Sequence, residues 1–207
     1  MKKFQNIIFD FDGVIGDTMN FYVEIGISLY KEFRHEKPKP KRIEELTGKS
    51  LVLLIRELKV PLTKLPYLEK RFRQDLTLKI DQVKIFKGIK EVLQQIKKEG
   101  YTLGVLSSNS QKNLHYIFKK NGIDFFDFIY SGSSLFGKGK VLAKLLKTYR
   151  LKPEKTVYIG DETRDIQAVK GNKVKIIAVG WGYEKSLKEQ NPDYFAGKPQ
   201  EIIKILS

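Results

Sequence analysis

Ile7-Ile8-Phe9-Asp10-Phe11-Asp12-Gly13-Val14 is the segment from which the architecture of this chain follows. Its apolar residues show no polar alternation, which is typical of a strand buried on both faces at the centre of a parallel sheet. Asp10 and Asp12 stand two residues apart at the end of that run, so their side chains point the same way. Buried carboxylates are costly unless they are paired or bind a metal ion, and in open α/β sheets ligands bind at this edge. Taken alone, the segment fits a ligand site or a helix cap and a turn equally well, so its interpretation depends on the rest of the chain.

The composition is that of an ordinary globular protein. The chain has 207 residues, of which 41% are hydrophobic and 12% aromatic, enough for one domain with an insertion. It contains no cysteine, which excludes disulfide bonds, thiolate metal sites and a cysteine nucleophile, and with two histidines the usual zinc sites are not expected. No stretch approaches the roughly 20 apolar residues of a membrane span, so we expect a cytoplasmic protein with no membrane partner.

The net charge is the unusual bulk property. It amounts to +15, from 39 basic and 24 acidic residues, and is compatible with nucleic-acid binding, a membrane surface or a field that attracts anionic substrates. The lysines are spread along the chain rather than gathered in one block, which favours a solvated lysine-rich surface. Nucleic acid is therefore an open but not a favoured partner.

Residues 17–82 carry only helix patterns. Apolar residues repeat at helical spacing from Tyr22 to Phe33, directly after Asp17 and Thr18, which are good helix-starting residues. Further helices are expected over 43–46, 51–58 and about 67–80, with prolines in the connections between them. A helical block inserted after one strand is typical of a cap domain, so we assign 17–82 to an all-helical cap and 1–16 with 83–207 to the core.

From residue 86 onward, helix and strand patterns alternate. Strands are expected at 101–106, 128–130, 156–159 and 175–179, with helices between them and a last helix over 201–206. Such alternation predicts an α/β fold with a doubly wound, parallel, Rossmann-like sheet.

Polar residues stand where four of these strands end. Because the carboxyl ends of parallel strands meet at one edge of the sheet, we expect these residues to converge. They are Asp10 and Asp12, Ser107 and Asn109, the loop 137–140, and Asp161 with Asp165.

The chemistry of this set is coherent. Clustered carboxylates without His or Cys suit Mg²⁺, which binds through carboxylates and a phosphate. A carboxylate can attack phosphorus to give an acyl phosphate, while a lysine and a serine hydroxyl hold the phosphoryl oxygens. Crowding of the carboxylates should raise the pKa of one of them, which would let Asp12 act as general acid. The sequence therefore predicts a phosphoryl-transfer site.

The chain resembles the haloacid dehalogenase-like hydrolase superfamily over nearly its whole length. The family's four motifs match, in order, Asp10-Phe11-Asp12-Gly13-Val14, Ser107 followed by Asn109, Lys138, and Gly160-Asp161-Glu162-Thr163-Arg164-Asp165. The resemblance implies Asp10 as nucleophile, Asp12 as acid/base and Lys138 with Ser107 as the groups that hold the phosphoryl group. It also implies Mg²⁺ at Asp10, the backbone carbonyl of Asp12, and Asp161, with Asp165 supporting the metal or the lysine.

Two parts of the resemblance leave alternatives open. Many relatives have proline after the motif lysine, whereas Gly139 and Lys140 follow here, so Lys140 is a second candidate for the phosphoryl-binding lysine. The predicted cap resembles those of phosphoglycolate phosphatase-like and β-phosphoglucomutase-like members, in which a turn between helices reaches over the site. Thr47-Gly48-Lys49-Ser50 is our candidate for that turn, although an ordinary exposed lysine explains Lys49 equally well.

The resemblance is strongest to the phosphoglycolate phosphatase subgroup, through Trp181-Gly182-Tyr183 and the later Pro192-Asp193-Tyr194-Phe195. It implies a Mg²⁺-dependent phosphatase, monomeric or homodimeric, that hydrolyses a small phosphorylated metabolite through an aspartyl phosphate. Ser108, Asn109, Gly48 and Lys49 are the expected substrate-binding residues. A phosphomutase of the same fold is the first alternative, and a nucleic-acid phosphatase or binder is a weaker one.

Overall fold

A six-stranded parallel sheet forms the centre of the computed structural model, which describes residues 2–34, 39, 41, 61–132 and 137–207. The strand order is β5-β4-β1-β6-β7-β8, and every neighbouring pair is parallel. The strands are β1 (Asn6–Asp10), β4 (Thr102–Ser107), β5 (Phe128–Ser131), β6 (Thr156–Gly160), β7 (Lys175–Val179) and β8 (Tyr194–Ala196). The predicted fold class is thus confirmed.

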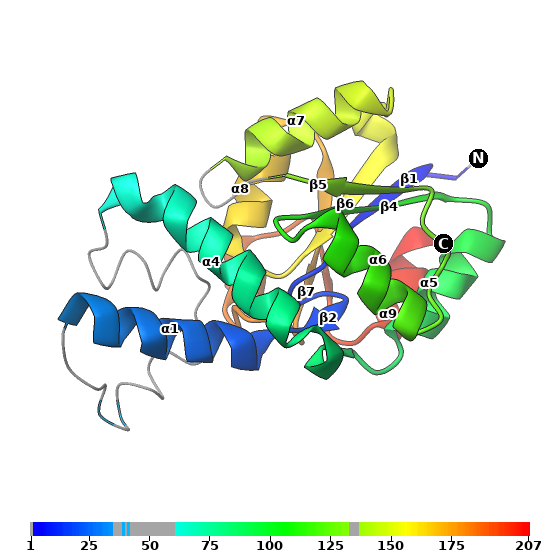
Figure 1. Cartoon of the computed structure of the whole chain (residues 1–207). Helices are drawn as coiled ribbons and strands as arrows, with labels where there is room; N and C mark the ends of the chain where they lie inside the picture. The colour runs from blue at the N-terminus through cyan, green and yellow to red at the C-terminus, as the bar shows by residue number, and fades with distance from the viewer. Residues whose placement is uncertain (1, 35–38, 40, 42–60, 133–136) are drawn as a thin grey trace.

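The side chains of the central strands alternate between two hydrophobic cores. On β1, Ile7 and Phe9 belong to one core and Ile8 belongs to the other. Helices α5 (Ile89–Lys98), α6 (Gln111–Lys120) and α9 (Gln200–Leu206) cover the first core, and α7 (Lys138–Thr148) and α8 (Thr163–Gly171) cover the second (Figure 1). Both faces of β1 are therefore buried, which explains its unbroken apolar sequence.

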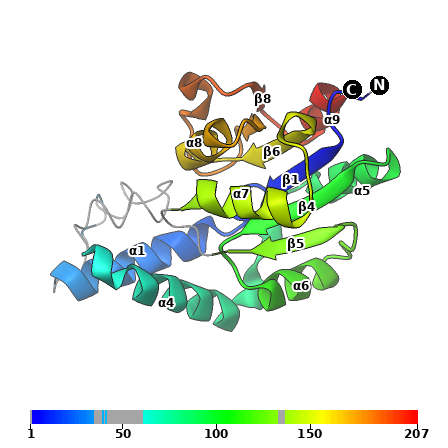
Figure 2. The ribbon, with the colours of Figure 1, turned by 90° about the horizontal axis from the view of Figure 1, so that it is seen from above.

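Two long helices extend beside this sheet, α1 (Met19–Arg34) and α4 (Leu65–Leu78). They run alongside each other in both views (Figures 1 and 2), joined by ion pairs of Arg71 with Glu32 and of Lys79 with Glu24. The predicted helices over 43–46 and 51–58, and the turn between them, lie outside the described residues. The helical part of the insertion that is described agrees with the prediction, and the division into cap and core domains remains a prediction.

The chain leaves and re-enters the sheet region through a two-stranded antiparallel ribbon. Its strands are β2 (Gly16–Asp17) and β3 (Lys84–Ile85), and Phe86 N–H donates to Ile15 O at 3.0 Å just beyond the ladder. The ribbon and the edge strand β8 were not expected from the sequence, because two or three residues are too short to show a periodic pattern. Four short 3₁₀ turns complete the described elements: Leu62–Lys64, Ile80–Gln82, Pro153–Lys155 and Leu187–Gln190.

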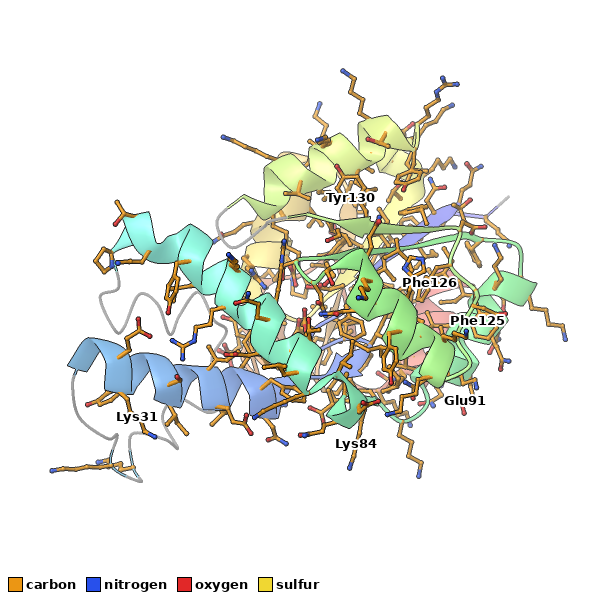
Figure 3. The ribbon with its side chains drawn as sticks, in the orientation of Figure 1. Lys31, Lys84, Glu91, Phe125, Phe126 and Tyr130 are labelled. Atoms are coloured by element: carbon orange, nitrogen blue, oxygen red, sulfur yellow. The ribbon has the colours of Figure 1, made fainter. Side chains whose placement is uncertain are left out.

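The surface agrees with the expectation of dispersed positive charge. Lys31 on α1 and Lys84 on β3 extend into solvent from separate elements (Figure 3). Within the described residues, no helix combines the length and the apolar composition needed to cross a bilayer.

Candidate active site

Three carboxylates meet at the carboxyl edge of the sheet. Asp10 is the last residue of β1, Asp161 directly follows β6, and Asp165 lies in the first turn of α8. One oxygen of each carboxylate lies within 4.8 Å of the others, and the three residues are at most 4% exposed. Residues about 150 positions apart thus converge where the parallel sheet predicts.

Lys138 is the cation of this cluster. It begins α7, is 5% exposed, and its Nζ forms ion pairs with Asp10 and Asp165. Burial alone would lower the pKa of Lys138, but the two carboxylates outweigh burial and hold the pKa well above its usual value. Lys140, the other candidate from the sequence, is exposed, so the geometry favours Lys138.

The pKa of Asp10 is raised although Asp10 forms an ion pair with Lys138. Burial raises its pKa from 3.8 to about 6, although the charge of Lys138 acts in the opposite direction. Phe11 N–H donates to Asp10 Oδ1 at 2.8 Å, and Lys138 pairs with Oδ2. Both oxygens are therefore oriented by the protein.

Asp12 has different surroundings from the three clustered carboxylates. Its Oδ1 accepts a hydrogen bond from the Thr18 hydroxyl at 2.8 Å, and the Thr18 hydroxyl is also bonded to the Tyr183 hydroxyl. Burial, followed by the charge of Asp10, raises the pKa of Asp12 to about 6. The Asp12 carboxylate is not part of the cluster that Asp10, Asp161 and Asp165 form. A contribution of Asp12 to metal binding through its backbone carbonyl remains a prediction.

The loop after β4 holds the predicted phosphoryl-binding residues. Ser107 Oγ accepts from Asn109 N–H at 3.0 Å, and Asn109 Oδ1 accepts from Ser110 N–H and Asn113 Nδ2. Asn109 Nδ2 is buried and has no hydrogen-bond partner among the residues that the structure describes. Because a buried amide donor without an acceptor is unfavourable, this group is ready to bind an anionic oxygen.

Helix α4 contacts this loop and the first turn of α6. Arg73 Nε donates to Ser108 O at 2.8 Å, and Asn113 Nδ2 donates to Thr77 Oγ1 at 2.9 Å. Ser108 thus touches a helix of the predicted cap through its backbone. Gly48 and Lys49 lie outside the described residues.

The backbone at Gly13 and Gly182 packs closely against the Asp161 side chain. A Cβ at Gly13, where φ is +77°, or at Gly182 would overlap the Asp161 side chain, so both positions require glycine. Tyr183 N–H donates to Asp161 Oδ2 at 2.8 Å. Burial, together with nearby carboxylates beginning with Glu162, raises the pKa of Asp161 well above its usual value.

Sequence reasoning missed four residues that belong to this arrangement. The sequence predicts Thr18 only as a helix-starting residue and Tyr183 only as part of the subgroup resemblance. In the structure Thr18 is hydrogen-bonded to Asp12, and Tyr183 is hydrogen-bonded to Thr18. Glu162 and Arg164 form a largely buried ion pair beside Asp161 and Asp165. Their sequence signal was their place inside the fourth motif, between its two aspartates.

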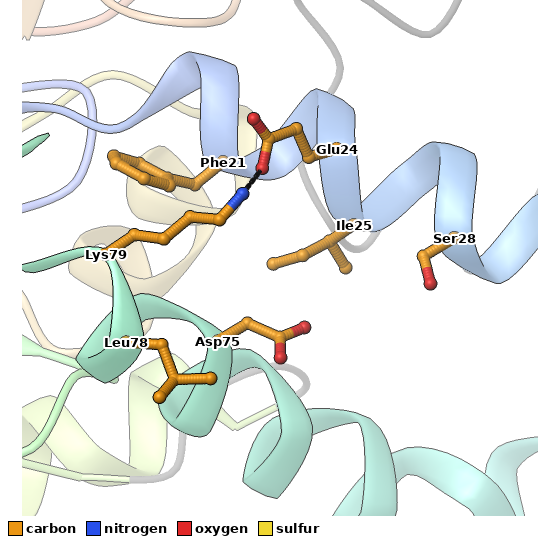
Figure 4. Close-up of a pocket in the computed structure, with 7 residues that line it drawn as sticks. All are labelled: Phe21, Glu24, Ile25, Ser28, Asp75, Leu78 and Lys79. Atoms are coloured by element: carbon orange, nitrogen blue, oxygen red, sulfur yellow. Dashed lines mark hydrogen bonds and ion pairs between the residues drawn. The ribbon is translucent and has the colours of Figure 1, made fainter.

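A separate cavity of about 250 Å³ lies between α1 and α4 (Figure 4). Phe21, Ile25 and Leu78 supply its apolar wall, and the Lys79–Glu24 ion pair crosses one end of it. It includes none of the clustered carboxylates, so it is distinct from the candidate active site.

Comparison with known proteins identifies the class. A family model described as haloacid dehalogenase-like hydrolase matches residues 7–179, so the chain belongs to this family. The phosphoglycolate phosphatase of Synechococcus elongatus is 26% identical over 98% of this chain and 97% of that protein. Pyrophosphatase PpaX of Bacillus mycoides is 24% identical over 99% of this chain and 98% of that protein.

Solved structures share this fold. A haloacid dehalogenase-like family hydrolase from Streptococcus pneumoniae superposes with a TM-score of 0.81 at 24% identity, covering 100% of both chains. The predicted family and enzyme class, a hydrolase of the phosphatase kind, are confirmed.

Proposed function

We propose that this protein is a Mg²⁺-dependent phosphatase that hydrolyses a small phosphorylated metabolite through an aspartyl phosphate on Asp10. The main support is the Asp10–Lys138 ion pair at the sheet edge, because it places an oriented carboxylate beside a fixed positive charge. The phosphatase names of full-length relatives support the same reaction class.

The proposed reaction has two displacements at phosphorus. Asp10 Oδ forms a bond to phosphorus while the ester P–O bond breaks, and the leaving oxygen takes a proton from Asp12. Water then attacks phosphorus and gives a proton to Asp12, the acyl-phosphate P–O bond breaks, and Asp10 is regenerated. A pKa of about 6 suits Asp12 to both proton transfers near neutral pH.

The phosphoryl oxygens need donors in both steps. Lys138 Nζ supplies a positive charge, and Ser107 Oγ with the unpartnered Asn109 Nδ2 supplies neutral donors. These groups come from different elements that the sheet holds rigidly, so they are oriented before the substrate binds.

The donor set fits a divalent hard cation. Asp10, Asp161 and Asp165 gather three buried carboxylates, and Asp161 is hydrogen-bonded to a backbone N–H rather than paired with Lys138. Asp10 and Asp161, with the carbonyl of Asp12, would hold Mg²⁺, while Asp165 holds Lys138. The metal ion would neutralise charge on the phosphoryl oxygens.

The test is phosphate release from a panel of phosphate esters, with Mg²⁺ and with the metal chelated. Phosphoglycolate and pyrophosphate belong in the panel because of the relatives' names, together with hexose phosphates, nucleotides and a 3′-phosphorylated oligonucleotide. We expect metal-dependent release from one class of small metabolite. Release confined to the oligonucleotide would instead support the nucleic-acid alternative, and silence across the panel would refute the phosphatase proposal and favour a phosphomutase.

Binding of Mg²⁺ can also be measured without turnover, by thermal unfolding. Bound Mg²⁺ stabilises the folded protein by mass action, so we expect a higher melting temperature with Mg²⁺ than with chelator. An unchanged melting temperature at millimolar Mg²⁺ would contradict the proposed metal site. A cytoplasmic location and a monomeric or homodimeric state remain predictions.

A further inference from the structure

Tyr183 contacts two separate parts of the candidate active site. It lies in the loop that follows β7 and is 2% exposed. Its backbone N–H donates to Asp161 Oδ2 at 2.8 Å. Its hydroxyl is bonded to the Thr18 hydroxyl, which donates to Asp12 Oδ1 at 2.8 Å. One residue therefore connects a carboxylate of the cluster with the proposed general acid.

The same loop also supports the turn that follows Asp12. Trp181 Nε1 donates to Val14 O at 3.1 Å. The ring of Tyr183 packs against that of Tyr22 on α1, with the ring centroids 5.1 Å apart. Ring packing on one side and the backbone hydrogen bond on the other thus fix where the Tyr183 hydroxyl lies.

The direction of each hydrogen bond in this chain follows from the number of hydrogens. The Thr18 hydroxyl has one hydrogen, which goes to Asp12 Oδ1 because an ionised carboxylate can only accept. The Tyr183 hydroxyl must then donate to Thr18 Oγ1. Among the residues that the structure describes, Asp12 Oδ1 takes this bond and Oδ2 takes none, so Oδ2 is the oxygen on which Asp12 carries its proton.

The packing of Tyr183 does not explain its hydroxyl. A phenylalanine would keep the ring contact with Tyr22 and the backbone hydrogen bond to Asp161. The hydroxyl occupies a lone pair of Thr18 Oγ1, and a hydroxyl that accepts a hydrogen bond donates its own more strongly. What the Tyr183 hydroxyl adds is therefore the orientation of the Asp12 carboxyl group.

We propose that Tyr183 is a positioning residue for the general acid, which it orients through Thr18 so that Asp12 Oδ2 faces the leaving oxygen. This inference rests on the proposed phosphatase function and deepens it, because it assigns the reaction a residue from the loop after β7. As the ester P–O bond breaks, the leaving oxygen takes the proton from Oδ2, and the electron pair of that O–H bond stays on Asp12.

The experiment compares two leaving groups that differ in their need for a proton. An alkoxide is strongly basic and needs protonation as it departs, whereas p-nitrophenolate departs as a stable anion. The substrates are p-nitrophenyl phosphate and the alkyl ester of the panel that the wild-type protein hydrolyses fastest. We compare kcat/KM, because it covers only the steps up to departure of the leaving group.

Tyr183→Phe removes the hydroxyl and nothing else. We expect kcat/KM to fall roughly 10-fold on the alkyl ester and less than about 2-fold on p-nitrophenyl phosphate, because the variant misplaces a general acid that contributes roughly 10²–10⁴-fold. When Asp12→Asn is already present, Tyr183→Phe should cause no further change in the ratio of the two kcat/KM values.

The matched control is Tyr101→Phe. Tyr101 is 3% exposed, and its hydroxyl donates to Leu206 O at 3.0 Å, at the amino end of β4 and so at the opposite end of the sheet from the carboxylates. This variant should leave the ratio of the two kcat/KM values unchanged. An equal loss on both esters in Tyr183→Phe, or no loss on either, would overturn the inference and leave the phosphatase proposal standing.

Urea unfolding measures the hydrogen-bond chain without turnover. Tyr183→Phe should destabilise the wild-type protein more than it destabilises Thr18→Val, because valine has no oxygen to accept the Tyr183 hydroxyl. Equal destabilisation of the two would overturn the inference whatever the activity. A folded wild-type protein that hydrolyses neither ester would refute the phosphatase proposal and, with it, the role of Tyr183 in the reaction.

Discussion

Replacing Asp12 by asparagine should stabilise the metal-free protein while it removes the general acid. Burial and the charge of Asp10 raise the pKa of Asp12 from 3.8 to about 6, a shift of about two units. Each unit corresponds to about 1.4 kcal/mol, so the ionised Asp12 lowers the free energy of unfolding by up to about 3 kcal/mol. The side-chain amide of the Asp12→Asn variant still accepts the Thr18 hydroxyl through its Oδ1, so this hydrogen bond is kept.

The stabilisation by Asp12→Asn should depend on pH in a direction that follows from the raised pKa of Asp12. The folded protein binds the Asp12 proton more tightly than the unfolded chain does. Well below pH 4 Asp12 is protonated in both states, so it does not lower the free energy of unfolding. Above about pH 6 it is ionised in both states and lowers the free energy of unfolding by the full amount. The advantage of Asp12→Asn over the wild type should therefore grow between about pH 4 and pH 6 and then stay constant. For a chain of this size, about 3 kcal/mol corresponds to a melting temperature higher by roughly 6–12 °C at pH 7.5.

The assay is urea unfolding of both proteins with chelator present, at pH 4.5 and pH 7.5. Asp124→Asn, at an exposed position between α6 and β5, is the control for loss of a surface carboxylate. If the free energies of unfolding of Asp12→Asn and wild type differ by the same amount at both pH values, the raised pKa of Asp12 is refuted.

Three further outcomes are expected. Asp10→Asn should abolish phosphate release while the far-UV circular dichroism spectrum stays unchanged, and more than trace activity would refute its role as nucleophile. Lys138→Ala should lower kcat by about 10²–10³-fold and Lys140→Ala by little, as steady-state kinetics would show, because Lys138 is paired with Asp10 and Lys140 is exposed. Asp161→Asn should abolish the rise in melting temperature on adding Mg²⁺, measured by thermal unfolding, and an undiminished rise would place the metal elsewhere.

The sheet and its polar edge could be predicted because both depend on simple periodic rules. The unbroken apolar run before Asp10 indicated a strand with two buried faces, and β1 lies between β4 and β6. Parallel strands place their carboxyl ends at one edge, which brought Asp10 and Asp161 together in the prediction and in the structure.

The connections around Asp12 could not be predicted in the same way. Tyr183 reaches Thr18 across 165 positions, and nothing in the local pattern of either residue indicates the other. The Glu162–Arg164 pair was visible as two charged residues in a motif, but only the three-dimensional structure reveals that both are largely withdrawn from solvent. Side-chain contacts that depend on how loops fold back have no periodic signature.

The position of β1 has a consequence for the order in which the protein can fold as it is synthesised. β1 comes first along the chain, but its neighbours β4 and β6 begin only at Thr102 and Thr156. An emerging chain therefore carries an apolar strand with both edges unpaired until β4 has left the ribosome, and with one edge unpaired until β6 has left it. During that interval the strand is a potential aggregation site, and we expect premature release of the chain before β6 to yield insoluble fragments rather than a smaller folded domain.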